Sequence, residues 1–335
     1  MRPSVSPLPR RGLARAAAAV LLSAALLAVA APAARAQRES PARYEPLNPT
    51  MVARSGLFVP DALAPGGGWR FGASAEYGSV VERNLAFPDY YLLDAELLRV
   101  QLRVRRGVGT RAVVELQGGV AGATGGFADA VFERYHSLIQ WVMEERDARP
   151  RNSYGDRLYL TRAGVDLRGR ARAALPSDLR ATVSIAHDVG AQSVLSVTLP
   201  TAPASSRYAR GVPTVSFVES VYPRLGERVS LTGSAGLGYA PRTGELRAVQ
   251  RPVFAMLSGG AVVRVARAHA VYGTMFYHSP AYQDTRFPEL DEGELSVDFG
   301  YRWQSRGGRR WRVGLTEDTR RRDPGIDLIV KVSVE

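Results

Sequence analysis

The regular alternation of apolar and polar residues in the second half of the chain constrains its fold more than any other feature. From Glu294 to Gln304 every odd-numbered residue is apolar, and every even-numbered residue is polar or glycine. Successive side chains of a strand point to opposite faces, so this stretch predicts a strand with one apolar face and one polar face. Similar runs recur from Trp69 to Glu335, which indicates an all-β domain.

Residues 1–36 have the features of a secretory signal peptide. Arg10, Arg11 and Arg15 precede an apolar run, and Ala34-Arg35-Ala36 has the small-x-small pattern of a cleavage site. The apolar run is shorter than the roughly 20 residues that a spanning helix needs. We therefore expect export, a periplasmic lead-in over residues 37–68, which are rich in Pro, Ala and Gly, and a barrel domain over residues 69–335.

Composition narrows the class of protein further. The chain has no cysteine, so it can have neither a lipid-anchored cysteine nor a disulfide. No apolar run after residue 36 is long enough for a spanning helix. The formal charge is +12, but the arginines alternate with acidic residues, which argues against a nucleic-acid surface in an exported protein.

The number of strands follows from the runs and their connections. From the sixth run on, long and short connections alternate, as in outer-membrane barrels with short periplasmic turns and longer outer loops. The alternation slips between the third and sixth runs, so we predict a closed antiparallel transmembrane β-barrel of about 12 strands, with 14 as the alternative. A secreted soluble β-sandwich is the other fold that this pattern allows. The thirteen runs cover residues 69–78, 91–104, 112–120, 157–168, 178–188, 195–199, 214–222, 228–239, 254–265, 271–277, 294–303, 310–316 and 326–335.

Two details of the first hairpin are predicted separately. Residues 80–90 read as a long link between the first two strands. In the second run the apolar residues change parity near Leu98, which predicts a β-bulge there.

The polar parity predicts the residues that face the lumen. If the apolar parity faces lipid, charges of both signs point inward and either line a narrow channel or lock it shut. The lumen-facing set is Asp94, Glu96, Glu115, Arg180, Asp298, Arg302 and Arg312, together with Gln117, Glu294 and Arg310.

Residues 122–152 break the alternation. Their apolar residues fall at helical spacing, which predicts a short amphipathic helix inside a long loop. Asp129, Glu133 and His136 share one face of that helix, where they could form a metal site or an acid–base set. A solvated polar face is the alternative interpretation, and we predict no metal and no cofactor.

Two further sets of residues allow chemistry. Residues 316–327 are crowded with acids and with Arg320, Arg321 and Arg322, which could bind a cation or a lipopolysaccharide phosphate, or simply pair with one another. A membrane-embedded lipid hydrolase would need a serine and a histidine in mutual reach. His136-Ser137 and His278-Ser279 are adjacent, but neighbours in a strand point to opposite faces, so we predict no catalytic residue.

Four short motifs resemble a known family. They are Leu47-Asn48-Pro49, Leu93-Asp94-Ala95-Glu96, Gly125-Gly126-Phe127-Ala128-Asp129 with His136 beyond it, and Gly314-Leu315-Thr316-Glu317-Asp318 followed by Pro324-Gly325-Ile326-Asp327. In this order they resemble a family of uncharacterised bacterial outer-membrane barrels catalogued as domain of unknown function (DUF) 3187. The resemblance implies a barrel in the outer membrane and no assigned activity.

The expected function is therefore broad. We expect passive passage or binding of a small or lipidic ligand, or a structural role in the Gram-negative envelope. A membrane-embedded lipid hydrolase and a soluble binding protein are the alternatives. The expected partners are outer-membrane lipid, lipopolysaccharide and, through the last strand, the barrel assembly machinery.

Overall fold

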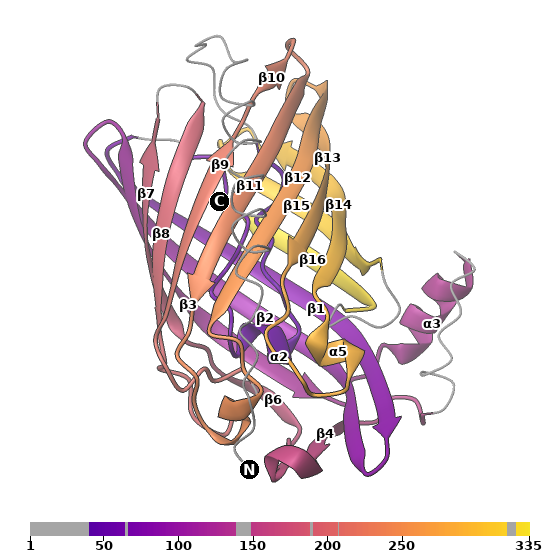
Figure 1. Cartoon of the computed structure of the whole chain (residues 1–335). Coiled ribbons are helices and arrows are strands. Elements are labelled where there is room, and N and C mark those ends of the chain that lie inside the picture. Colours follow the sequence, from indigo (N-terminus) through magenta and orange to yellow (C-terminus); the bar gives the residue numbers. More distant parts are fainter. Residues whose placement is uncertain (1–39, 64–65, 139–148, 188–189, 207, 320–325) are drawn as a thin grey trace.

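The computed structural model describes residues 40–335 except 64–65, 139–148, 188–189, 207 and 320–325, so the predicted signal peptide lies outside the described residues. Twelve strands form one closed antiparallel barrel (Figure 1). Each strand pairs with the next, and β16 closes the ring against β1. The barrel strands are β1 (Trp69–Ala86), β2 (Asp89–Val108), β3 (Ala112–Thr124), β7 (Leu179–Ala186), β8 (Ala191–Leu199), β9 (Thr214–Val221), β11 (Val229–Tyr239), β12 (Val253–Ala266), β13 (His269–His278), β14 (Glu294–Gln304), β15 (Arg310–Asp318) and β16 (Leu328–Val334).

The remaining described elements belong to the connections. The run predicted at 157–168 is not a barrel strand but a short hairpin, β4 with β5, which pairs with β2 only at residues Tyr90–Asp94. Removing it from the thirteen predicted runs leaves the observed twelve, so the alternative of fourteen strands is excluded. The connecting elements are α2 (Pro49–Val52), α3 (Asp129–Leu138), β4 (Gly155–Leu160), η1 (Thr161–Ala163), β5 (Val165–Arg168), β6 (Arg172–Pro176), β10 (Arg224–Leu225), η2 (Glu245–Ala248) and α5 (Pro288–Asp291).

Except for the two-residue link 87–88, which lies at the end with the long connections, short and long connections lie at opposite ends of the barrel. One end, here called the turn end, has the short connections 109–111, 187–190, 222–228, 267–268 and 305–309. The other, the loop end, has 125–178, 200–213, 240–252, 279–293 and 319–327. In Figure 1 the turn end carries β10, and the loop end carries α3, α5 and β4. The helix predicted within the long loop is present as α3. Among the described residues no helix is long and apolar enough to span a membrane.

The first hairpin differs from its prediction in both details. Only Phe87 and Pro88 link β1 to β2, and the pairing is continuous from Trp69 with Arg106 to Ala86 with Asp89. The long link at 80–90 was therefore wrong. The bulge near Leu98 was wrong too, because Leu98 keeps its register with both neighbouring strands. The parity of the apolar residues changes because different faces of β2 are apolar in its two halves. Leu93 and Leu97 are buried in the core, whereas Leu102 is exposed on the opposite face.

The barrel has an apolar outside and a polar inside. Large apolar side chains are exposed on the outward parity, and polar side chains on the inward parity are buried. This inverts the pattern of a soluble protein and suits a wall that faces lipid. Outward residues include Leu116, Val183, Leu195, Phe217, Leu257, Met275 and Phe299, and inward residues include Gln117, Thr182, Ser196, Ser216, Thr274, Asp298 and Thr316.

A segment predicted to lie in the periplasm fills the barrel instead. Residues 40–63, here called the lumen segment, are buried at nearly every position, and α2 lies within the outline of the barrel (Figure 1). For these residues the predicted lead-in was wrong. Tyr44, Leu47, Met51, Leu57 and Phe58 provide the physical reason: the barrel gives these apolar side chains a core that an exposed linker lacks.

Candidate functional site

The lumen segment runs into the barrel from the turn end and back again. Ala42 packs on Val262 and Ala270 beside a short turn, whereas α2 reaches the loops at the opposite end. The returning leg pairs with the entering leg, since Val59 N donates to Tyr44 O at 2.8 Å. Ala62 N then donates to Ser40 Oγ at 2.9 Å, so the two legs meet again at the turn end.

The reversal of the segment is encoded by Asn48 and Pro49. The Asn48 side chain caps α2 by accepting from Thr50 N at 2.9 Å, and Pro49 occupies the first helical turn, where no backbone donor is needed. Asn48 Nδ2 also donates to Glu82 on β1 at 2.7 Å. The cap therefore turns the chain and ties the turn to the barrel wall.

Buried ion pairs hold the middle of the segment. Arg180 on β7 donates to both carboxylate oxygens of Glu45, at 2.6 and 2.9 Å. Arg99 on β2 donates to the carbonyls of Glu45 and Pro46, at 2.9 and 2.6 Å, while it pairs with Glu76. The wall and the segment thus satisfy one another's charges.

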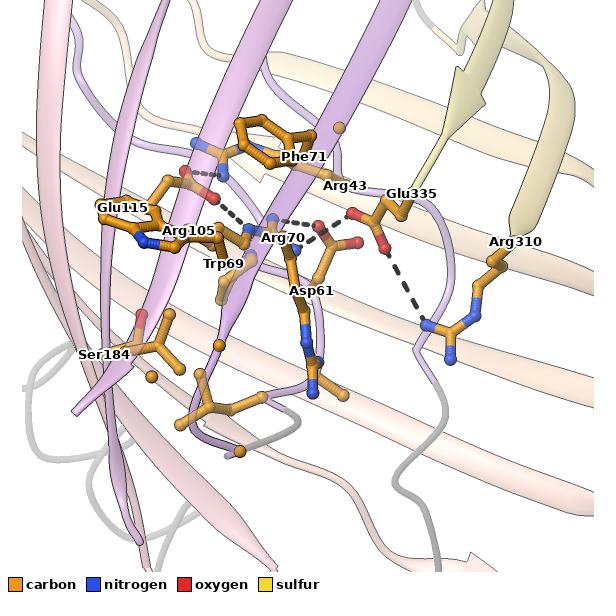
Figure 2. Close-up of a pocket in the computed structure, with 18 of the residues that line it drawn as sticks. Arg43, Asp61, Trp69, Arg70, Phe71, Arg105, Glu115, Ser184, Arg310 and Glu335 are labelled. Atoms are coloured by element: carbon orange, nitrogen blue, oxygen red, sulfur yellow. Dashed lines mark hydrogen bonds and ion pairs between the residues drawn. The ribbon is translucent and has the colours of Figure 1, made fainter. Parts of the chain in front are cut away.

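A second group of charges lies near the turn end. Asp61 of the lumen segment pairs with Arg103 at 2.9 Å, Arg105 at 2.8 Å and Arg312 at 3.2 Å. Glu115 pairs with Arg43 at 2.8 Å and with Arg105. Figure 2 shows several of these side chains around a cavity of about 600 Å³ between the lumen segment and the turn-end rim.

The loop end of the segment is fastened by backbone carbonyls. Arg54 donates to the carbonyls of Pro241 at 2.9 Å and Ala240 at 3.1 Å. Arg210 donates to the Ser55 carbonyl at 2.8 Å. Both arginines are buried, so the loop-end connections pack directly against the lumen segment.

The predicted lumen-facing residues divide into two groups. Glu115, Arg180, Asp298 and Arg312 are buried on the inward parity, and Arg302 lies partly buried on the same parity of β14 as Asp298. Asp298 accepts from Thr316 at 2.9 Å and pairs with Lys331 at 2.7 Å. These side chains lie where the alternation placed them.

Asp94 and Glu96 do not face the lumen, and their prediction was wrong. They share a parity of β2 with Leu98, opposite to the inward Arg99 that binds the lumen segment. The β3–β7 connection covers them: Arg149 pairs with Asp94 at 2.7 Å, and Glu96 accepts from the Phe127 and Ala128 amides at 2.9 and 2.6 Å. On the outside of the barrel, Glu96 anchors the start of α3, and Asp94 anchors the chain beyond it.

The three α3 residues predicted as a cluster bind separate partners. Asp129 accepts from Asn152 N at 2.6 Å, Glu133 pairs with Arg151 at 2.6 Å, and His136 meets Glu317 at 3.3 Å. Within the described part of the chain no group of three or more His, Cys, Asp or Glu side chains could hold a metal. Arg320, Arg321 and Arg322 of the other predicted cluster lie outside the described residues.

The fold can now be compared with known proteins. No family model matches the chain, and no curated protein matches it. Among solved structures it is similar to an outer membrane channel from Pseudomonas putida F1, with a TM-score of 0.52 at 13% identity over 82% of this chain and 97% of that one. This likeness shows a shared fold.

Two other solved structures match with lower scores. A NanC porin has a TM-score of 0.45 at 8% identity, over 79% of this chain and 98% of that one. The toluene transporter TbuX of Ralstonia pickettii has a TM-score of 0.38 at 9% identity, over 80% of this chain and 88% of that one.

Two serine–histidine contacts bear on the hydrolase alternative. His278 Nε2 lies 2.6 Å from Ser55 Oγ, while its Nδ1 lies 2.5 Å from the Ser279 carbonyl oxygen. Both side chains are buried, so this pair fastens the lumen segment to β13. His187 Nε2 lies 2.6 Å from Ser193 Oγ, which donates to Glu219. There the serine bridges the other two groups, whereas a hydrolytic triad places the histidine in the middle.

Sequence reasoning missed the residues that hold the lumen segment in the barrel. Arg43, Glu45, Ser55 and Asp61 lie in a stretch without strand or helix periodicity. One signal was present: the segment mixes these polar residues with bulky apolar ones, including Tyr44, Leu47, Met51, Leu57 and Phe58. An exposed linker is normally poor in such residues.

Proposed function

We propose that the protein is an outer-membrane channel for passive passage of a small solute, and that the lumen segment closes it. The closed barrel, its apolar outer surface and its likeness in fold to an outer membrane channel support this placement. Export by the predicted signal peptide and membership of the DUF3187 family are parts of the same proposal.

The observation that carries the proposal is the polar boundary between the lumen segment and the wall. A barrel with only a structural role could fill its interior with side chains from its own strands. Here a separate stretch of chain occupies the lumen, and many of its contacts are hydrogen bonds and ion pairs to inward polar residues. Such contacts can be exchanged for water at a net cost of about 1.5–3 kcal/mol for each hydrogen bond to a charged group. The polar contacts can therefore be exchanged as the segment shifts, whereas its apolar side chains, which pack in one core with the wall, hold the closed state.

An engineered disulfide tests the movement directly. A Cβ built on Gly56 lies 3.0 Å from Oγ1 of Thr214 on β9. A disulfide places Cβ about 3 Å from the opposite sulfur, given its S–S bond of about 2 Å. The chain has no cysteine of its own, so G56C/T214C forms only this bond. We would measure single-channel conductance of the folded barrel in a planar bilayer, before and after reduction.

The reduced double variant should conduct, and the oxidised one should not. Wild-type protein should open intermittently, oxidised G56C/T214C should stay closed, and dithiothreitol should restore its openings. The single variants G56C and T214C, each insensitive to the reductant, control for the substitutions. If the wild type never conducts, and neither does the E45Q variant with a loosened lumen segment, passage is wrong and an envelope structural role takes its place.

A further inference from the structure

The cavity at the turn end has more positive than negative charge. Its lining includes five arginines and three acidic residues in a volume of about 600 Å³. The charged residues are Arg43, Arg70, Arg105, Arg309, Arg310, Asp61, Glu115 and Glu335. Figure 2 shows Arg43, Arg70, Arg105 and Arg310 coming from the lumen segment and different strands toward the same space.

Two more arginines pair with two of these three acids. Arg103 and Arg312 each pair with both Asp61 and Glu335, at distances between 2.9 and 3.5 Å. Their side chains are each 2% exposed. The acids are thus shared among more guanidinium groups than they can neutralise. Around the buried side chains of Arg43, Arg103 and Arg312, water can screen little of the remaining charge.

Buried nitrogens around the cavity also lack acceptors. The Arg43 side chain is 9% exposed, and its Nε and Nη2 have no hydrogen-bond acceptor among the described residues. Arg103 Nε and Arg312 Nε, in a smaller cavity that Arg43 also lines, likewise have no acceptor among the described residues. A buried donor without an acceptor is costly, so these nitrogens favour an acceptor supplied from outside.

We infer that this cavity binds a small organic solute carrying two or more carboxylate or phosphate groups. Guanidinium groups present paired N–H donors that match the oxygens of such groups. Arg43 and Arg105 hold the inner part of the cavity, and the exposed Arg70 and Arg309 hold its rim. The inference rests on the proposed channel function and names the chemical class of its solute. The cavity lies next to the lumen segment, so a solute bound there would be at the turn end of the closed channel.

Calorimetric titration of the folded barrel in detergent tests the site without requiring passage. Citrate and inorganic pyrophosphate represent the carboxylate and phosphate forms, and glucose and spermidine are the neutral and cationic controls. Wild-type protein should bind at least one anion saturably and neither control. R43Q should weaken binding by on the order of tenfold, as expected when a charged hydrogen-bonding group is lost. R70Q/R309Q should also weaken it, and these exposed positions carry little risk to folding.

The affinity for the anion should increase when an acid that competes for the arginines is removed. Glu115 occupies Arg43 and Arg105, so E115Q should tighten anion binding, which a loss of stability alone cannot do. R247Q changes an exposed arginine of η2 at the far end of the barrel and should bind as the wild type does. Absence of saturable anion binding, equal binding by glucose, or equal affinities in R43Q, E115Q and R247Q would overturn the inference. A barrel that conducts but does not bind refutes the anion site alone, and one that binds but never conducts refutes passage alone.

Discussion

Glu45 and Arg180 meet inside the barrel through two hydrogen bonds of 2.6 and 2.9 Å, although they are 135 residues apart in the chain. Their side chains are 8% and 3% exposed. The pair joins the lumen segment to β7 near the start of that strand. Replacing either residue therefore measures how much the contact between the lumen segment and the barrel stabilises the protein.

Breaking this pair on one side should destabilise the protein strongly. E45Q or R180Q leaves the other charge buried without its partner, which costs about 3–5 kcal/mol. Urea unfolding in lipid vesicles, followed by tryptophan fluorescence, measures the loss. The exposed pair of Arg157 and Asp166, at 3.1 Å, is the matched control: D166N should lower the stability far less than E45Q or R180Q does. Equal losses for the two pairs would show that the lumen pair is as well hydrated as a surface pair.

Close packing of β3 against β2 makes Gly119 sensitive to a single methyl group. A Cβ at Gly119 would lie 1.9 Å from the carbonyl oxygen of Val100. G119A should therefore separate the strands locally and destabilise the barrel by about 1–3 kcal/mol, the usual range for overpacking. G259A on the outward face of β12 adds its methyl group where no atom lies within 4 Å, and should fold normally. Heat-modifiable gel migration and urea midpoints compare them, and a wild-type midpoint for G119A would contradict the close approach.

The docking of α3 on the barrel should weaken as pH rises. Burial by itself lowers the pKa of His136, but the hydrogen bond and the charge of Glu317 outweigh it, so the pKa is raised overall. A raised folded-state pKa means that the pair contributes its full stability below the ordinary histidine pKa of about 6.5. That contribution is lost as pH rises through the raised value.

Hydrogen exchange of α3 measures this docking. Exchange, corrected for its intrinsic pH dependence, should be slower at pH 6 than at pH 9 in the wild type. H136Q should remove most of the difference, and H269Q, which changes an exposed histidine at the turn end, should retain it. A pH dependence in H136Q as large as that of the wild type would rule out His136 as its source.

An arginine placed among the outward apolar side chains of the barrel should destabilise the protein more the deeper it lies in the membrane. Leu195 lies mid-strand on β8, 49% exposed and paired with the outward Val183 and Phe217. L195R should cost about 2–4 kcal/mol in vesicles, the range for arginine at the bilayer midplane. V265R, at an exposed position near the turn end, should cost about 0–1 kcal/mol because arginine there reaches the interface. Equal costs at the two positions would place the membrane elsewhere on the barrel.

The fold class and the strand number were predictable because their signals are local. Alternation with a period of two depends only on which residues follow one another, and it places Asp298 and Arg312 inside and Leu195 outside. The separation of short turns from long loops is local too. It exposed the error in counting thirteen runs, although it could not show that the run at 157–168 was the one outside the barrel.

The contents of the lumen and the covering of β2 were decided by tertiary structure. Asp94 and Glu96 look like lumen residues because they are charged and alternate with apolar neighbours. Their face is nevertheless the outer one, buried under a connection that is remote in sequence. The lumen segment likewise has no period of its own, because its shape is set by the wall that surrounds it. A strand's sequence determines that its two faces differ, whereas the surroundings of each face depend on which distant segment packs there.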